Sequence, residues 1–239
     1  MFRLALRRTE GLIGSILALP DRATLSCRAE RLEAPRPCSG RGPVHLLVDS
    51  TGLKLRGPGE WLMEKHGTQT RRRWRKLHLA TEAGTGRIVA AALTGHGADD
   101  GSRVGPLLAQ VAGPVASFTA DGAFGRGDVH GEVTARHPHA TVVMPPRSGA
   151  VPSDTAATAP TRRDDHLQPI AERGRMGWQR ASGYTLRALV EADIARWKRA
   201  IGDGLRSRTD GRQAVEVAIA ARVLNRMLDL GRPEYVRIA

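Results

Sequence analysis

Short apolar runs separated by turn residues characterise the chain between residues 44 and 144, and this pattern predicts strands. The first run is almost wholly apolar and leads directly into Asp49, which is typical of a buried strand that ends in an acid. Glu82–Gly86 has the composition of a turn and predicts a hairpin between the second and third runs. The predicted strands are Val44–Val48, Trp74–Thr81, Arg87–Thr94, Val115–Asp121 and Ala140–Met144.

Apolar residues at helical spacing predict the helices. A stripe of four apolar side chains marks the first helix after the hairpin, and two longer amphipathic stretches follow near the end of the chain. The predicted helices are Phe2–Leu19 with a second short helix after it, Asp100–Val111, Val129–Arg136, Tyr184–Ile201 and Gln213–Leu230. This order of elements predicts an α/β domain with helices on both faces of one mixed sheet.

Two turn-rich stretches divide the chain. Glu33–Pro43 predicts a linker, so we expect a helical segment at 1–43 and the main domain at 44–239. Within the main domain, residues at about 145–166 are polar and predict a mobile surface insertion. In the N-terminal segment, Arg28 and Arg31 fit either a helix-turn-helix-like DNA contact or a helical hairpin docked on the core.

The net charge of the chain says more about its partner than the overall composition does. Lys and Arg number 37 against 24 Asp and Glu, which leaves a net charge of +13 and indicates a polyanionic partner such as nucleic acid. Aromatic residues make up only 4%, which argues against a protein that stacks single-stranded bases. Cys27 and Cys38 lack the partners of a zinc site, and no run reaches the length of a membrane helix, so we expect a cytoplasmic protein.

Two acids lie at the ends of apolar strands, where a carboxylate must be solvated, hydrogen-bonded or bound to a cation. Asp49 and Asp121 either cap turns separately or meet if their strands are neighbours. On the helix predicted from Tyr184, a polar stripe contains Arg187, Glu191 and Lys198. That stripe is either functional or a set of surface ion pairs, with Arg187 and Glu191 four residues apart.

The segment Tyr184-Thr-Leu-Arg187-Ala-Leu-Val-Glu191, continuing to Lys198, matches the Tyr-x2-Arg-x3-Glu-x6-Lys signature of bacterial insertion-sequence DDE transposases. The wider chain resembles the insertion-sequence-four and insertion-sequence-five types of this family from about residue 4 to residue 237. The segments that carry this resemblance are VDSTGLKLRGPGEW, KHGTQTRRRWRKLHL, ADGAF, MPPR and VLNRMLDLGRP. The resemblance therefore implies a ribonuclease-H-like fold, a mixed sheet flanked by helices.

By the same resemblance, Asp49, Asp121 and Glu191 are the catalytic and metal-binding acids. It implies a DNA transposase that cleaves transposon ends and transfers the 3′-hydroxyl to target DNA. Three carboxylates suit two Mg²⁺ ions, with Mn²⁺ as a plausible substitute, in a two-metal mechanism. Tyr184, Arg187 and Lys198 are the accessory signature residues, and the two cations among them suit phosphate contacts.

The expected partner is double-stranded DNA, both the terminal inverted repeats and the target, bound by a homodimer in the bacterial nucleoid. A dense basic run leads into the second strand and suits backbone contacts with a duplex, although a solvated hairpin face fits it too. This run comprises Arg71, Arg72, Arg73, Arg75 and Lys76. His66 and His78 are expected to pack or hydrogen-bond, and the acidic pairs Asp99-Asp100 and Asp164-Asp165 to cap helices or lie in loops, not to bind metal.

The sequence also departs from the family pattern. Phe124-Gly125 stands where Tyr-Asp usually follows Asp-Gly-Ala, which predicts altered packing near Asp121. Because members of the family generally have a longer N-terminal region, we expect this chain to be N-terminally truncated. The alternatives to an active transposase are a remnant that only binds DNA and a simple metal-dependent nuclease on the same fold.

Overall fold

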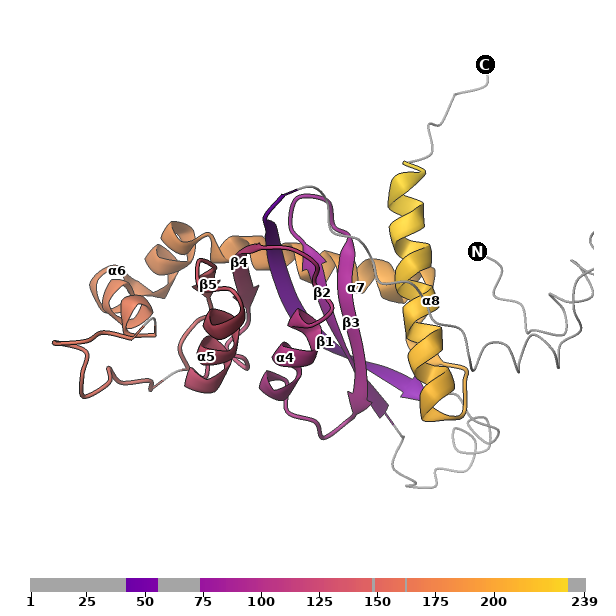
Figure 1. Ribbon diagram of the computed structural model, residues 1–239, viewed down its shortest axis with the longest axis horizontal. Helices are drawn as coiled ribbons and strands as arrows, with labels where there is room; N and C mark the ends of the chain where they lie inside the picture. The colour runs from indigo at the N-terminus through magenta and orange to yellow at the C-terminus, as the bar shows by residue number, and fades with distance from the viewer. Residues whose placement is uncertain (1–41, 56–73, 148, 162, 232–239) are drawn as a thin grey trace, which may run out of the picture.

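Strand β1 is the centre of the fold. The computed structural model describes residues 42–55, 74–147, 149–161 and 163–231. In this part of the chain, six strands form one sheet in the order β3-β2-β1-β4-β5, and β6 pairs with the far end of β1 (Figure 1). The strands are β1 (Val44–Leu55), β2 (Trp74–Glu82), β3 (Ile88–Gly95), β4 (Val115–Ala120), β5 (Thr141–Val143) and β6 (Gly204–Leu205).

The sheet is mixed because it contains both antiparallel and parallel strand pairs. A hairpin makes β2 antiparallel to β1 and β3 antiparallel to β2. The later strands β4 and β6 pair with β1 in parallel, and β5 pairs with β4 in parallel. Each parallel strand is reached through a crossover that contains helix, as parallel pairing requires.

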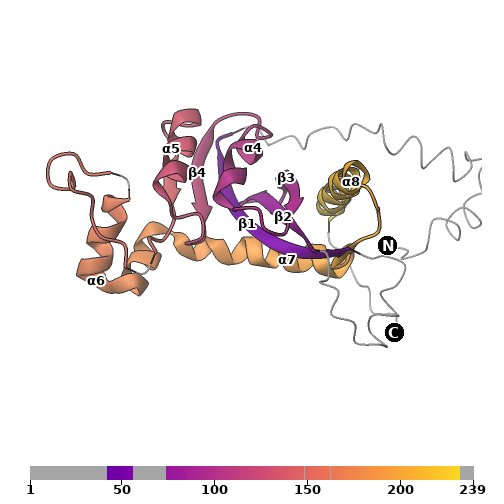
Figure 2. The ribbon, with the colours of Figure 1, turned by 90° about the horizontal axis from the view of Figure 1, so that it is seen from below.

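Helices cover both faces of the sheet. They are η1 (Gly101–Arg103), α4 (Val104–Leu108), α5 (Gly127–Arg136), α6 (Asp164–Ser182), η2 (Tyr184–Arg187), α7 (Ala188–Ala200) and α8 (Asp210–Asp229). On one face, α4 and α5 pack in a core around Leu46, Val48 and Phe118. On the other face, α7 and α8 pack around Leu53, Leu77 and Leu79 (Figure 2). The predicted α/β architecture, a mixed sheet flanked by helices, is confirmed.

Burial on both sides explains why β1 is so apolar. Leu46, Leu47 and Val48 are all almost fully buried, and successive side chains along a strand point to opposite faces. Each such side chain stabilises the folded state by about 1.5–3 kcal/mol when it leaves water. The central strand is therefore a rigid support for whatever side chains follow this apolar run.

Three elements differ from the sequence prediction. Strand β1 does not end at Asp49 but continues to Leu55, because Ser50–Lys54 pair with β2 and the last two residues pair with β6. The predicted helix Asp100–Val111 is shorter, with η1 and α4 covering 101–108. The predicted helix Tyr184–Ile201 begins with the 3-10 turn η2 and becomes α-helical only at Ala188.

Helix α6 was not predicted at all. Its sequence is mostly polar, contains Pro169, and passes through a non-helical backbone conformation at Gly174. Of its side chains, only Asp164 and Trp178 are buried, so the apolar period that reveals most helices is missing. The helix is held by a few specific contacts instead of by a broad apolar face.

Several predictions concern residues outside the described part of the chain. These are the N-terminal helices with Arg28 and Arg31, residue His66, and the first three members of the basic run, Arg71, Arg72 and Arg73. The described residues of the predicted insertion include no helix or strand before α6, and its mobility stays a prediction. Asp164 closes this segment by accepting hydrogen bonds from Ser153 and Thr161. Among the described residues, no helix is long and apolar enough to cross a membrane.

Candidate active site

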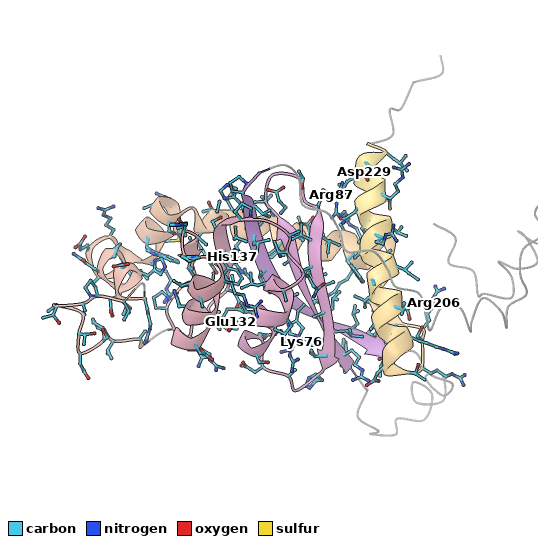
Figure 3. The ribbon with its side chains drawn as sticks, in the orientation of Figure 1. Lys76, Arg87, Glu132, His137, Arg206 and Asp229 are labelled. Carbon is cyan, nitrogen blue, oxygen red and sulfur yellow. The ribbon has the colours of Figure 1, made fainter. Side chains whose placement is uncertain are left out.

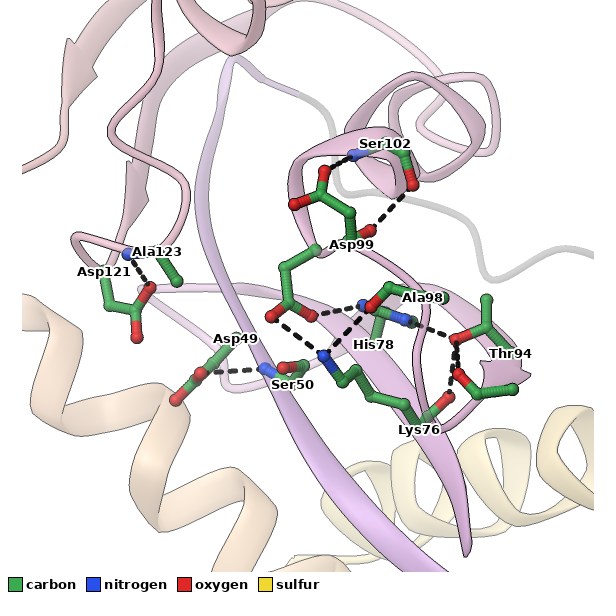
Figure 4. A network of polar contacts seen from close by, with 12 residues as sticks. Asp49, Ser50, Lys76, His78, Thr94, Ala98, Asp99, Ser102, Asp121 and Ala123 are labelled. Carbon is green, nitrogen blue, oxygen red and sulfur yellow. Dashed lines mark hydrogen bonds and ion pairs between the residues drawn. The ribbon is translucent and has the colours of Figure 1, made fainter.

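Two acids come from neighbouring parallel strands. Val48 of β1 pairs with Ala120 of β4, so the next residues, Asp49 and Asp121, lie side by side. Figure 4 shows both carboxylates near the point where β4 ends. The pairing of β1 with β4 therefore places two residues that are far apart in the sequence next to each other. This is the arrangement that the sequence analysis required for the two acids to meet.

The third acid comes from helix α7, which packs against β1. Glu191 lies in the first turn of this helix, and the preceding turn η2 contacts both β1 and β4. The guanidinium of Arg187 joins all three acids. Its Nη2 lies 3.2 Å from Asp49 Oδ2 and 3.7 Å from Asp121 Oδ2, and its Nη1 lies 2.5 Å from Glu191 Oε1.

Backbone amides fix the two strand carboxylates. Asp49 Oδ1 accepts a hydrogen bond of 2.8 Å from the amide of Ser50, and Asp121 Oδ1 accepts one of 2.8 Å from the amide of Ala123. In each pair, the second carboxylate oxygen is the one nearest to Arg187. The oxygens that face the common centre are thus oriented by the main chain.

Burial and like charge both act on this centre. Burial raises the pKa of Asp49 above its ordinary value, and the negative charges of Asp121 and Glu191 raise it further. The hydrogen bond from the Ser50 amide and the positive charge of Arg187 lower this pKa, but they do not cancel the increase. Burial lowers the pKa of Arg187, but the surrounding acids outweigh burial and raise it. Burial also raises the pKa of the Tyr184 phenol. The site favours an added positive charge, which Arg187 supplies in this structure.

The donor set suits a hard divalent cation. Three carboxylates around one positive group supply the oxygen ligands that Mg²⁺ prefers. Among the described residues, no group of three acids, histidines or cysteines lies close enough together to hold a metal ion. The three carboxylates therefore match the ligand chemistry of Mg²⁺, but with Arg187 among them they do not form a metal site in this structure.

The other two signature residues differ in their placement. Tyr184 is half-buried, and its ring packs against the indole of Trp178 with centroids 5.3 Å apart. Lys198 is exposed on α7, seven residues beyond Glu191, which is about 10 Å along a helix axis. Tyr184 thus borders the acids, whereas Lys198 lies further along the same helix.

The two described members of the basic run make internal ion pairs. Arg75 pairs with Asp210 and donates a hydrogen bond to Gln213, both on α8. Lys76 lies 3.1 Å from Asp100 Oδ2 and donates to the carbonyl of Ala98. Their predicted role in DNA binding requires that they exchange these partners for phosphates, and it stays a prediction.

His78 belongs to a buried network on the face of the sheet opposite Asp49. It is fully buried and pairs across the strands with Ser50, the residue after Asp49. Its Nε2 lies 2.9 Å from Thr94 Oγ1 and its Nδ1 lies 3.3 Å from Asp100 Oδ1 (Figure 4). Burial lowers the pKa of His78 to about 4, so the imidazole is neutral at pH 7. In this structure the side chain therefore hydrogen-bonds and packs.

The departure at Phe124-Gly125 has a physical explanation. Phe124 is buried in the core beside α4 and α5. A Cβ atom on Gly125 would lie only 2.6 Å from the carbonyl oxygen of Pro145. The loop that carries Asp121 therefore packs directly on the backbone of the MPPR segment, and this contact leaves no room for the aspartate that the family pattern has.

Sequence reasoning missed a chain of aromatic contacts behind Tyr184. The indole of Trp178 lies between Tyr184 and His166, and His166 reaches the carbonyl of Val142 in β5. Figure 3 draws the described side chains on these elements, and most of those on α6 point away from the sheet. No periodic pattern points to these residues, because they come from a kinked, mostly polar helix.

Comparisons with known proteins identify the family of the chain. Residues 40–228 match a family model described as a transposase DDE domain, and residues 1–58 match a second model with the same description. A solved structure of a piggyBac transposase synaptic complex with hairpin DNA is similar, with a TM-score of 0.46 and 14% identity over 78% of this chain. The chain spans about half of that protein, since the match covers 47% of it. By the match over residues 40–228, the chain belongs to the transposase DDE domain family.

Proposed function

We propose that this chain is the catalytic core of a DNA transposase, which cleaves the ends of a mobile element and joins the freed 3′-hydroxyl to target DNA. Asp49, Asp121 and Glu191 are its catalytic acids. The observation that carries the proposal is the convergence of these acids, from two strands and a late helix, on the single guanidinium of Arg187. Membership of the DDE transposase family supports the same reaction class.

The acids would hold a divalent cation, which we propose is Mg²⁺ with Mn²⁺ as a substitute. When bound, two such ions would supply activation of the attacking oxygen and charge stabilisation of the leaving oxygen in an in-line displacement at phosphorus. The chain's own contribution is orientation: the Ser50 and Ala123 amides hold the carboxylates of Asp49 and Asp121 so that one oxygen of each faces the centre.

Arg187 would serve as the phosphate contact nearest the reacting group. Its planar guanidinium can grip two phosphate oxygens at once, and such charge-assisted bonds are stronger than neutral ones. Lys198, exposed further along α7, would bind a more distant phosphate as a point charge. Tyr184 would border the terminal nucleotide, since it lies between the acids and the α6 core.

The proposed substrate is double-stranded DNA, both the terminal inverted repeats and the target. The net charge of +13 supports a polyanionic partner. Transposition brings two ends together, so we propose a homodimer on DNA as the working form. Association through phosphates releases counterions, so affinity should fall steeply as salt rises.

Purified protein and labelled duplexes that carry the terminal inverted repeats test the proposal. We expect Mg²⁺-dependent cleavage at the element end, followed by strand transfer in the presence of target DNA. Tight binding of the same duplexes without cleavage, in either Mg²⁺ or Mn²⁺, would instead support the alternative, a remnant that only binds DNA. Cleavage without strand transfer would support the metal-dependent nuclease.

A further inference from the structure

We infer that Trp178 and His166 are positioning residues for Tyr184, linking its ring to the strand that lies beside β4. The inference rests on the proposed function, because Tyr184 matters to activity only if the acids beside it are catalytic. It concerns residues outside the Tyr-Arg-Glu-Lys signature, on a helix that sequence reasoning did not predict.

The first link is the packing of two rings. Trp178 is 2% exposed, and its ring centroid lies 5.3 Å from that of Tyr184 at an interplanar angle of 37°. Gly183, at φ 72, ends α6 and directs the chain back, so that Tyr184 starts η2 beside the helix it has just left. Such a φ suits glycine, which has no Cβ. The indole is thus a fixed wall for the Tyr184 ring.

The second link orients the indole itself. Trp178 Nε1 donates a hydrogen bond of 3.2 Å to His166 Nδ1, and the two rings meet edge to face with centroids 5.4 Å apart. In a straight helix, residues 12 positions apart are separated by about 18 Å along the axis. The break at Gly174 makes this contact possible by turning one half of α6 toward the other (Figure 1).

The third link ties the pair to the sheet. His166 Nε2 lies 2.8 Å from the carbonyl oxygen of Val142, which only accepts, so the ring donates from Nε2 and accepts at Nδ1. Val142 is in β5 and pairs with Phe118 of β4, the strand that leads to Asp121. Trp178 and His166 therefore connect the Tyr184 ring to β5 and β4, the strand pair that also places Asp121.

This link explains why a helix with so little buried surface is folded against the sheet. Proximity effects in catalysis are sensitive to displacement, and a shift of about 1 Å can cost about 100-fold in rate. Loss of the indole would remove the buried ring against which the Tyr184 side chain packs. The positioning role predicts a lower turnover with little change in KM for DNA, because Tyr184 is not expected to supply the bulk of the phosphate contacts.

A fluorine label on Tyr184 tests the link without relying on activity. The chain has two tyrosines, so 3-fluorotyrosine in a Tyr235→Phe background gives a single ¹⁹F resonance from Tyr184. We expect Trp178→Leu to move this resonance toward its position in the unfolded protein and to lower kcat for end cleavage by about 10- to 100-fold. Trp178→Phe, which keeps a ring, should restore part of both.

Trp197→Leu is the matched control, because Trp197 is equally buried but lies in the core formed with α8. It should leave the resonance in place. If Trp178→Leu does not fold, Trp178→Phe and His166→Phe decide the question by the same measurement. An unmoved resonance in the Trp178 and His166 variants, or an equal shift in Trp197→Leu, would overturn the inference. A wild-type protein that cleaves no DNA would refute the proposed function and leave the ¹⁹F result standing.

Discussion

Arg187 Nη2 lies 3.2 Å from Asp49 Oδ2, and the residues are separated by 138 positions in the chain. This contact joins η2 to the central strand, and the same guanidinium also reaches Asp121 and Glu191. Three carboxylates repel one another, so a positive group among them stabilises their convergence. Arg187 supplies that charge in this structure.

Replacement of Arg187 should therefore affect stability and metal binding in opposite directions. We expect Arg187→Gln to lower the free energy of unfolding by about 1–2 kcal/mol, a value reduced for the partial exposure of the pairs. Because the guanidinium no longer competes for the carboxylates, Mn²⁺ should raise the melting temperature of the variant more than that of the wild type. Thermal unfolding with and without Mn²⁺ measures both, and an equal effect of Mn²⁺ on the two proteins would contradict the competition.

Arg75→Gln is the matched control for that experiment. Arg75 also pairs with an acid far away in the sequence, Asp210, and donates a hydrogen bond to Gln213, but both partners are on α8 and away from the three acids. Its replacement should leave the response to Mn²⁺ unchanged.

His78 predicts a pH dependence of stability. Its pKa is lowered from the ordinary 6.5 to about 4 in the folded protein, so the folded state binds its proton less readily than the unfolded state. The neutral imidazole therefore contributes to the free energy of unfolding above pH 6.5. This contribution is lost as the pH falls from 6.5 toward 4, and the loss is up to about 3 kcal/mol. Urea unfolding of wild type and His78→Gln at several pH values checks this: the difference between them should shrink by that amount on acidification, and a constant difference would refute it.

Asn225 fastens α8 to the edge of the hairpin. Its side chain accepts a hydrogen bond from the amide of Ile88 and donates one to the carbonyl of the same residue, both at 2.8 Å and both buried. Asn225→Ala leaves these two backbone groups without partners, so we expect a loss of about 2–4 kcal/mol in the free energy of unfolding. The exposed neighbour Arg226→Ala should change it by less than about 0.5 kcal/mol, and similar values for the two variants in urea unfolding would count against this role.

Gly125 should tolerate no side chain. A Cβ there would meet the Pro145 carbonyl oxygen at 2.6 Å, and neither group is a flexible side-chain end. We expect Gly125→Ala to destabilise by about 1–3 kcal/mol, and Gly125→Asp, which restores the residue of the family pattern, to destabilise further. Gly127→Ala nearby has open space around its Cβ and serves as the control. Equal melting temperatures for the Gly125 and Gly127 variants would show that the loop shifts freely.

The elements that apolar periodicity reveals were predicted well, and those that single contacts hold were not. The apolar runs of β1 and β4 and the amphipathic pattern of α8 are visible in the sequence because broad faces are buried. Helix α6 has Pro169, Gly174 and only two buried side chains, so nothing periodic marks it. The end of β1 was wrong by seven residues, because pairing with β2 and β6, which no local pattern encodes, continues the strand from Val48 to Leu55.

The contacts of the candidate site also divide into one that the sequence pattern predicted and others that depend on the tertiary fold. Spacing alone predicted the pair of Arg187 and Glu191 four residues apart, and the structure contains it. The same guanidinium also reaches Asp49 and Asp121, which depends on the register of β1 with β4 and on the docking of η2 against both strands. The resemblance to a transposase family selected the three acids, whereas the residues alone only made them candidates: Asp49 and Asp121 as acids at the ends of apolar strands, and Glu191 as part of a polar helical stripe.

The central claim is that Asp49, Asp121 and Glu191 act as one catalytic centre on DNA. Its most direct test is single-turnover cleavage of element-end duplexes in Mg²⁺ by Asp49→Asn, Asp121→Asn and Glu191→Gln, with duplex affinity measured in parallel. We expect each variant to lose at least about 1,000-fold in cleavage rate, comparable to loss of one key transition-state contact, while binding the duplex as the wild type does. Cleavage at the wild-type rate by any one of the three would contradict it.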